Sequence, residues 1–177
     1  MPNDTQKIIT HLWFDDQAEE AMNFYVSVFK NSPLKEASKS RIVSITRYPH
    51  DMQVGPLADM GGKVLTGVFE LAGQRFMALD GGPIFKFNES ISLLIDCETQ
   101  EEIDYFWEHL SAVPEAEQCG WVKDKFGLSW QINAKVLGEL IADLDAEKSK
   151  RVLQTMLQMK KLDIAALREA YEGTPVE

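Results

Sequence analysis

The chain has 177 residues and a mass of about 20.0 kDa, which suits one average domain or two small modules. Hydrophobic residues make up 45% of the chain and charged residues 26%, a composition that excludes wholesale disorder. Lys and Arg number 18 against 28 Asp and Glu, which gives a net charge of −10. This acidic balance argues against nucleic acid or an anionic membrane surface as a partner, because both select basic surfaces.

The sequence carries no signal for export or for membrane insertion. No segment approaches the roughly 18–20 apolar residues that a membrane span needs, and residues 1–7 are polar, unlike a secretion signal. The two cysteines, Cys97 and Cys119, stand in no CxxC or zinc-ligand spacing. We interpret them as reduced, partly buried thiols rather than as a disulfide, and we expect a cytoplasmic protein with no membrane partner.

The first half of the chain predicts a strand, a helix and three further strands. Residues 8–14 are β-branched and aromatic and stop at two aspartates. Asp16 and Glu19 then form a capping-box pattern, and an apolar face follows at helical spacing until Pro33 ends the helix. The further strands are expected at residues 41–48, 64–71 and 75–79, with a hairpin turn at residues 72–74.

Between the first two of these strands lies a long loop, residues 49–62. Its glycines and prolines predict irregular structure. Structureless loops of this length often serve as lids or partner-binding arms, but a simple edge excursion fits the residues equally well.

The order of elements then begins again. A strand is expected at residues 90–97, and Thr99 and Glu102 repeat the capping box ahead of a second helix. Short strands are expected at residues 116–118, 121–123 and 128–133. The residues after 136 predict only helices, at 136–144, 146–160 and 163–171, the last with Asp163 as N-cap and Gly173 just beyond its end. We therefore predict a first module at 1–82, a shorter second module at 83–135, and a helical extension at 136–177.

The residues at the two ends of this repeat carry a family resemblance. The segments concerned are Trp13-Phe14-Asp15, Ala18-Glu19-Glu20-Ala21, Phe24-Tyr25, Cys119-Gly120-Trp121 and the run from Lys123 to Gln131. They resemble the PhnB-like proteins of the glyoxalase, or vicinal-oxygen-chelate, superfamily, a group that often carries the description "3-demethylubiquinone-9 3-methyltransferase domain". The resemblance implies an α+β fold of two βαβββ modules, each a curved mixed sheet forming half of a cavity, in a homodimer.

The resemblance also implies a divalent metal as cofactor, with ligands on the first and last strands. At the matching positions this chain has His11 on the first strand and Gln131 on the last, and Thr66 where a histidine is usual. Such a set lacks carboxylate charge, so it is a poor site for a dication. A lone strand histidine is more often a packing residue than a ligand, and we favour that interpretation of His11.

The methyltransferase description finds no support in the residues. A Gly-rich loop after the first strand would hold S-adenosylmethionine, but the first strand runs into two aspartates and no glycine precedes Gly55. The sequence also lacks GxGxxG and GxxxxGK[ST], which disfavours nucleotide-dependent chemistry.

Without a metal site or a cofactor loop, the residues still predict an aromatic and apolar binding surface with a few neutral polar groups. The candidate binding residues are Phe14, Thr66, Met77, Asp80, Trp121 and Trp130. Asp80 could face the mouth of the cavity or serve a turn. Alternate strand residues face opposite sides, and the sequence does not decide which side lines the cavity.

Three hypotheses for function follow. The one we favour is a small-molecule-binding protein on the glyoxalase scaffold, and not a true methyltransferase. The second is a metal-dependent lyase, isomerase or dioxygenase whose metal is held by His11 and Gln131. The third is a partner-binding scaffold acting through the acidic helical tail and the long loop. The fold alone does not choose among them.

Overall fold

The computed structural model describes residues 6–51 and 59–173. These residues form two compact units, residues 1–86 and 87–177. The strands are β1 (Thr10–Phe14), β2 (Arg41–Arg47), β3 (Val64–Leu71), β4 (Gln74–Asp80), β5 (Leu93–Cys97), β6 (Trp121–Lys123) and β7 (Ser129–Ala134). The α-helices are α1 (Ala18–Lys30), α2 (Gln100–Leu110), α3 (Lys135–Ile141), α4 (Ala146–Leu157) and α5 (Ile164–Glu172), and Lys35–Lys39 and Pro114–Ala116 are short 3₁₀ helices. The expected α+β class with two open mixed sheets is confirmed.

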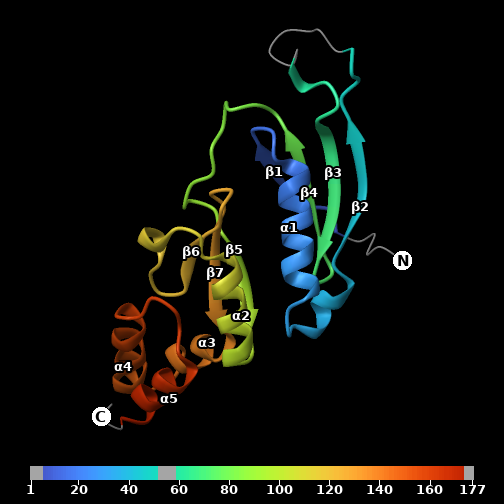
Figure 1. Ribbon diagram of the computed structural model, residues 1–177. Helices are drawn as coiled ribbons and strands as arrows, with labels where there is room; N and C mark the ends of the chain where they lie inside the picture. The colour runs from blue at the N-terminus through green and yellow to red at the C-terminus, as the bar shows by residue number, and fades with distance from the viewer. Residues whose placement is uncertain (1–5, 52–58, 174–177) are drawn as a thin grey trace. The chain divides into compact units, whose positions relative to one another are not determined.

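The first unit is a four-stranded sheet with α1 against one face (Figure 1). The strand order is β1-β4-β3-β2, in which β1 is parallel to β4 and the other pairs are antiparallel. The hairpin expected between β3 and β4 is present with a two-residue loop, Ala72 and Gly73. Both have positive φ, 47° and 81°, the conformation that matches the twist of a tight hairpin.

The start of α1 differs from the prediction. Asp16 does not cap the helix: the N-cap is Gln17, which makes no side-chain capping bond, and Asp16 pairs with Lys63. The buried Asp80 takes over this role from the end of β4, because its Oδ1 accepts a hydrogen bond from the Ala18 amide at 2.8 Å. A carboxylate supplied from another element satisfies the helix terminus as well as a local cap does.

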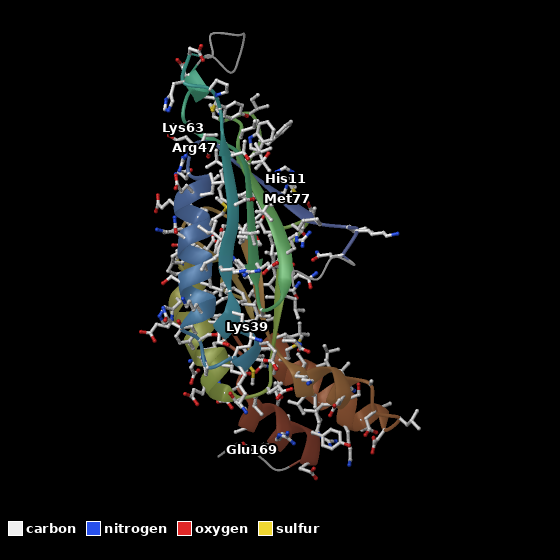
Figure 2. The ribbon with its side chains drawn as sticks, turned by 90° about the vertical axis from the view of Figure 1, so that its right-hand side faces the viewer. His11, Lys39, Arg47, Lys63, Met77 and Glu169 are labelled. Carbon is white, nitrogen blue, oxygen red and sulfur yellow. The ribbon has the colours of Figure 1, made fainter. Side chains whose placement is uncertain are left out.

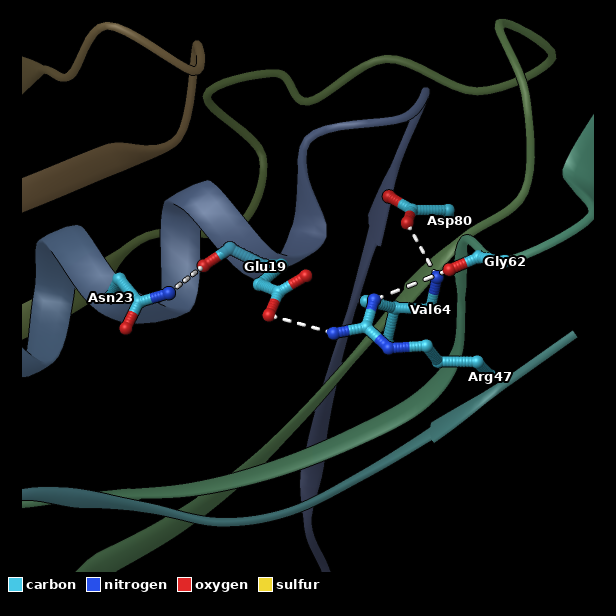
Figure 3. A network of polar contacts seen from close by, with 6 residues as sticks. All are labelled: Glu19, Asn23, Arg47, Gly62, Val64 and Asp80. Carbon is cyan, nitrogen blue, oxygen red and sulfur yellow. Dashed lines mark hydrogen bonds and ion pairs between the residues drawn. The ribbon is translucent and has the colours of Figure 1, made fainter.

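Asp80 also joins α1 to the sheet, and Figure 3 shows its contact with Val64 at the start of β3. Its Oδ2 accepts from the Val64 amide at 2.8 Å, and the Tyr48 hydroxyl donates to its backbone carbonyl. Nearby, Arg47 donates to Glu19 of α1 and to the Gly62 carbonyl. These contacts hold the ends of β2, β3 and β4 against the first turn of the helix.

The core of the first unit lies between α1 and the sheet. It is aromatic: Phe69 stacks on Phe76 with centroids 5.5 Å apart, and Tyr25 of α1 lies over Phe69 at 6.4 Å. Gly67 is required beneath the helix, because a Cβ there would come within 2.5 Å of the Met22 side chain.

The second unit has a three-stranded sheet of order β5-β7-β6, in which β5 and β7 are parallel. The strand expected at residues 116–118 does not form. A 3₁₀ helix occupies Pro114–Ala116, and Gln118 makes only an isolated bridge to Trp121, so among the described residues this sheet has one strand fewer than the first. Pro114 favours this local helix, because its ring fixes φ and removes an amide donor.

The capping box of α2 is confirmed. The Thr99 hydroxyl accepts from the Glu102 amide, and the Glu102 carboxylate accepts from the Thr99 amide. At the other end of the chain, Asp163 caps α5 and Gly173 follows it with φ of 79°, as the sequence predicts.

The three C-terminal helices belong to the second unit. The chain between α4 and α5 is bonded to the turn before β6, because the Met159 and Lys160 carbonyls accept from the Cys119 and Gly120 amides. Leu162, in the same segment, is buried. Part of the long loop predicted at residues 49–62 lies outside the described residues.

Candidate functional site

The first unit presents one sheet face that its helix does not cover. Gly67 points toward Met22 of α1, so its neighbours Thr66 and Val68 point the other way. The register carries this alternation to the adjacent strands: Met77 lies opposite both Val68 and His11. Figure 2 shows α1 on one side of the strands and His11 and Met77 labelled on the other. We call this surface the open face; it comprises His11, Trp13, Arg41, Ser44, Thr46, Thr66, Val68, Glu70, Arg75, Met77 and Leu79.

A β-bulge keeps β2 in phase with this face. The pairing shifts between Ile42 and Ser44, so Ser44 lies opposite Val68 and Thr46 opposite Thr66. The extra residue places Ser44 and Thr46 on the open face and leaves Ile42 and Ile45 on the helix side.

The middle of the open face is apolar and only partly buried. Val68, Met77 and Leu79 lie on adjacent strands, and each is half-buried, whereas the residues between them on the helix side, such as Phe69 and Ala78, are buried. The middle of the open face is therefore apolar and partly accessible to solvent.

Trp13 bounds one end of the open face. Its indole Nε1 donates to the Gly82 carbonyl at 2.9 Å, and Phe85 meets its ring edge-on with centroids 5.0 Å apart. Its ring lies so close to Gly81 that a Cβ there would approach it to 2.1 Å. Glycine at this position lets the chain after β4 fold against the indole.

Charged residues bound the other end. Arg41 of β2 contacts Glu70 of β3 at 3.1 Å, and Glu70 lies opposite Arg75 of β4. The open face thus grades from an aromatic end through an apolar middle to a charged end.

The second unit also has a face turned away from its helix. Alternation along β7 puts Gln131 and Asn133 there, and the register adds Trp121 of β6 and Leu94 of β5. The Gln131 amide donates to the Ser92 hydroxyl at 2.8 Å. The Asn133 amide donates to the Asp96 carboxylate at 2.8 Å, so this face combines aromatic and neutral polar groups with one acidic group.

The donor atoms present do not fit a divalent metal. Within the described residues, no three side chains of His, Cys, Asp or Glu gather in an arrangement that could hold a metal ion. His11 has Met77 as its cross-strand neighbour, and the Gln131 amide is engaged with Ser92. Three or four hard or borderline donors would be needed, so we derive no chemistry through a metal.

The other titratable candidates serve the fold. His109 stacks on Tyr105 with its Nδ1 2.7 Å from the Tyr105 carbonyl, and the His50 ring lies against Gly62. Cys97 is buried under α2, and burial raises the pKa of its thiol to about 12, with the charges of Glu102 and Asp96 adding to the effect. Such a thiol is not a nucleophile at neutral pH.

Comparison with known proteins assigns the family. Residues 6–133 match the family described as 3-demethylubiquinone-9 3-methyltransferase. A solved PhnB protein from Bacillus cereus is 38% identical over 73% of this chain and 99% of its own, with a TM-score of 0.57. The chain belongs to the PhnB-like family. The resemblance expected from the sequence is thereby confirmed.

A protein from Pseudomonas aeruginosa shares the fold at 17% identity, over 74% of this chain and 98% of its own, with a TM-score of 0.53. No curated protein matches the chain. The region shared with the PhnB-like family covers both sheets and ends before α3, so the three C-terminal helices lie outside it.

In this PhnB-like protein, some of the predicted site residues lie on the open face of the first unit and others on the uncovered sheet face of the second unit. Thr66, Met77 and the ligand candidate His11 lie together on the open face, and Trp121 and Gln131 lie opposite each other in the second unit.

Phe14, Asp80 and Trp130 do not lie on these faces. Phe14 and Asp80 are paired on the helix side of their sheet. The buried Trp130 indole donates to Asp124 at 2.8 Å on the side that α2 covers. We correct their placement accordingly, because strand alternation gives each of them to the core.

Sequence reasoning also missed two groups of the open face. Val68 and Leu79 share a face with Met77 by period-two alternation, a signal that needs one reference residue to assign the side. Arg75 and Glu70 could be recognised only once the β3–β4 register is known.

Proposed function

We propose that this PhnB-like protein binds a small, largely apolar molecule on the open face of its first unit. The observation that carries the proposal is the half-buried apolar middle of that face, Val68, Met77 and Leu79, flanked by the polar side chains of His11 and Thr66. Protein sites for small molecules combine apolar lining with a few convergent polar groups.

The proposal excludes methyl transfer from S-adenosylmethionine. It is supported by the connection from β1 to α1, where two aspartates and Gln17 stand in place of a glycine-rich loop. The first amide of α1 is occupied by the Asp80 carboxylate, so this helix terminus is not available to an anionic cofactor group.

Other functions stay predictions with their own measurements. A lyase, isomerase or dioxygenase that uses a metal would purify with stoichiometric metal and lose it in His11→Ala. Partner binding by the tail would be weakened by a polar substitution of an exposed apolar residue such as Leu157→Gln, without loss of ligand binding. The homodimer is a proposal that the family resemblance supports, and light scattering of the purified protein tests it. The cytoplasmic location is a proposal that the two free cysteines support. Among the described residues, no helix is long and apolar enough to cross a membrane.

Fluorescence titration with N-phenyl-1-naphthylamine, an uncharged apolar probe, tests the proposed binding. We expect saturable binding of one probe per chain, weakened about tenfold by Met77→Gln because a polar group replaces the centre of the apolar surface. Leu144→Gln is the matched control, since Leu144 is a fully exposed apolar residue of the second unit. Equal binding by both variants, or no saturable binding, would contradict the proposal.

A further inference from the structure

Arg75 lies at the charged end of the open face. Its backbone is fixed on both sides by Gln6, whose amide accepts from the Arg75 N–H and donates to the Arg75 carbonyl. Arg75 as a residue is half-buried, and its guanidinium makes no hydrogen bond or ion pair with any residue that the structure describes. A partly desolvated guanidinium without a partner favours an anion.

The neighbouring carboxylate is already engaged. Glu70 has a side chain only 14% exposed, and one of its oxygens accepts from both Nε and Nη2 of Arg41. This row of the sheet therefore holds two guanidinium groups and one carboxylate, and the carboxylate is bonded to Arg41. Glu70 is also the only acidic residue among the strand positions of the open face, so the row carries one net positive charge.

The charge of the first unit, taken by itself, does not oppose an anion. Residues 1–86 contain nine Lys and Arg against ten Asp and Glu, whereas residues 87–177 contain nine against eighteen. The acidity of the protein resides almost entirely in the second unit. The first unit is nearly neutral in net charge, and the row of Arg41, Glu70 and Arg75 gives it a local positive charge that attracts an anion.

The spacing along the strand joins this row to the apolar middle. Arg75 and Met77 are two residues apart on β4 and on the same face, about 7 Å along the strand. A guanidinium on its three-carbon stem spans that distance. A molecule whose ring covers Met77 and Val68 can therefore place an anionic substituent against Arg75.

We infer that the open face takes an aromatic or apolar small molecule that carries a carboxylate, with the ring on Val68 and Met77 and the carboxylate on Arg75. One net positive charge balances a monoanion, and the planar fork of arginine matches a carboxylate with two parallel hydrogen bonds. The inference rests on the proposed function and specifies the class of its ligand.

The test compares 2-naphthoate with 2-naphthamide, which have the same ring and differ in charge. Isothermal titration should show 2-naphthoate binding about tenfold more tightly to the unaltered protein, the size expected for a charge-assisted hydrogen bond. Arg75→Met should abolish this preference and leave the affinity for 2-naphthamide unchanged. Arg168→Met changes the net charge equally at an exposed site of α5 and should preserve the preference.

A second variant should change the preference for 2-naphthoate in the opposite direction. Glu70→Gln removes the only carboxylate on the open face and frees Arg41, so it should increase the preference for 2-naphthoate severalfold. If Arg75→Met does not fold by circular dichroism, Arg75→Gln provides the same readout with a polar side chain.

The outcomes separate this inference from the proposed function. Equal affinity for the two naphthalenes, or a preference that survives Arg75→Met, would overturn the carboxylate assignment and leave apolar binding standing. Binding of neither compound would overturn both. An apparent Kd that rises with protein concentration would mean that a second copy of the chain competes for this face, and would also overturn the inference.

Discussion

Asp80 is a carboxylate on which two elements depend. It is 1% exposed, and its two oxygens accept from the Ala18 and Val64 amides. Asp80→Ala should lower the free energy of unfolding by about 2–4 kcal/mol, because two buried donors lose their acceptor. Urea unfolding measures this. Asp15→Ala, which removes an exposed carboxylate between β1 and α1, is the control, and equal losses in the two variants would refute the role assigned to Asp80.

Because the Cys97 thiol is buried, we expect the protein to lose stability at alkaline pH. Burial raises the pKa of its thiol from 9.0 to about 12, so above pH 9 the unfolded thiol ionises while the folded one stays neutral. The free energy of unfolding should therefore fall between pH 9 and 12, by up to about 1.4 kcal/mol per pH unit from this group. Urea unfolding at pH 8 and 10 should show a shallower fall in Cys97→Ala. An unchanged fall would contradict the effect.

At the scale of elements, the two capping-box patterns in the sequence form different contacts in the structure. We therefore expect their removal to change the free energy of unfolding by different amounts. Thr99→Ala should cost about 1 kcal/mol of unfolding free energy, because the Thr99 hydroxyl accepts from the Glu102 amide. Asp16→Ala should cost less than about 0.5 kcal/mol, because Asp16 makes only an exposed pair with Lys63. Thermal or urea unfolding of both variants measures the difference, and a larger loss for Asp16→Ala would overturn the observed capping.

This pair of helices shows where local sequence suffices and where it does not. The bond between Thr99 and Glu102 closes within four residues, so the pattern specifies it. The bond at Ala18 comes from Asp80, 62 residues away, and a local pattern has no information on such a partner. The β3–β4 hairpin and the ends of α5 were likewise predictable, because their turn and cap residues are adjacent in the chain.

The candidate site was predictable only in part for a related reason. Strand alternation identifies the set that includes Met77 and the set that includes Phe76, but assigning one set to the core requires the position of the helix. The bulge in β2 and the register that brings Arg75 beside Glu70 are tertiary features as well. Aromatic composition therefore placed Phe14 and Trp130 with the binding residues although both are buried in the core.

At the scale of the whole molecule, the C-terminal helices complete the second unit. Leu162, between α4 and α5, is 1% exposed, whereas Leu144, between α3 and α4, is 102% exposed. Leu162→Ala should lower the free energy of unfolding of this unit by about 2–4 kcal/mol, and Leu144→Ala by less than about 0.5 kcal/mol. Differential scanning calorimetry checks both variants. Similar effects would mean that the tail does not pack as described.

The most direct test of ligand binding at the open face compares the NMR signals of two methionines. Met77 lies on that face, and Met22 is fully buried between α1 and the other side of the same sheet. Proton–carbon spectra of protein labelled at the methionine methyl groups, recorded during titration with 2-naphthamide, should show the Met77 signal moving to saturation while the Met22 signal stays in place. A Met77 signal that does not move at saturating compound would contradict the account.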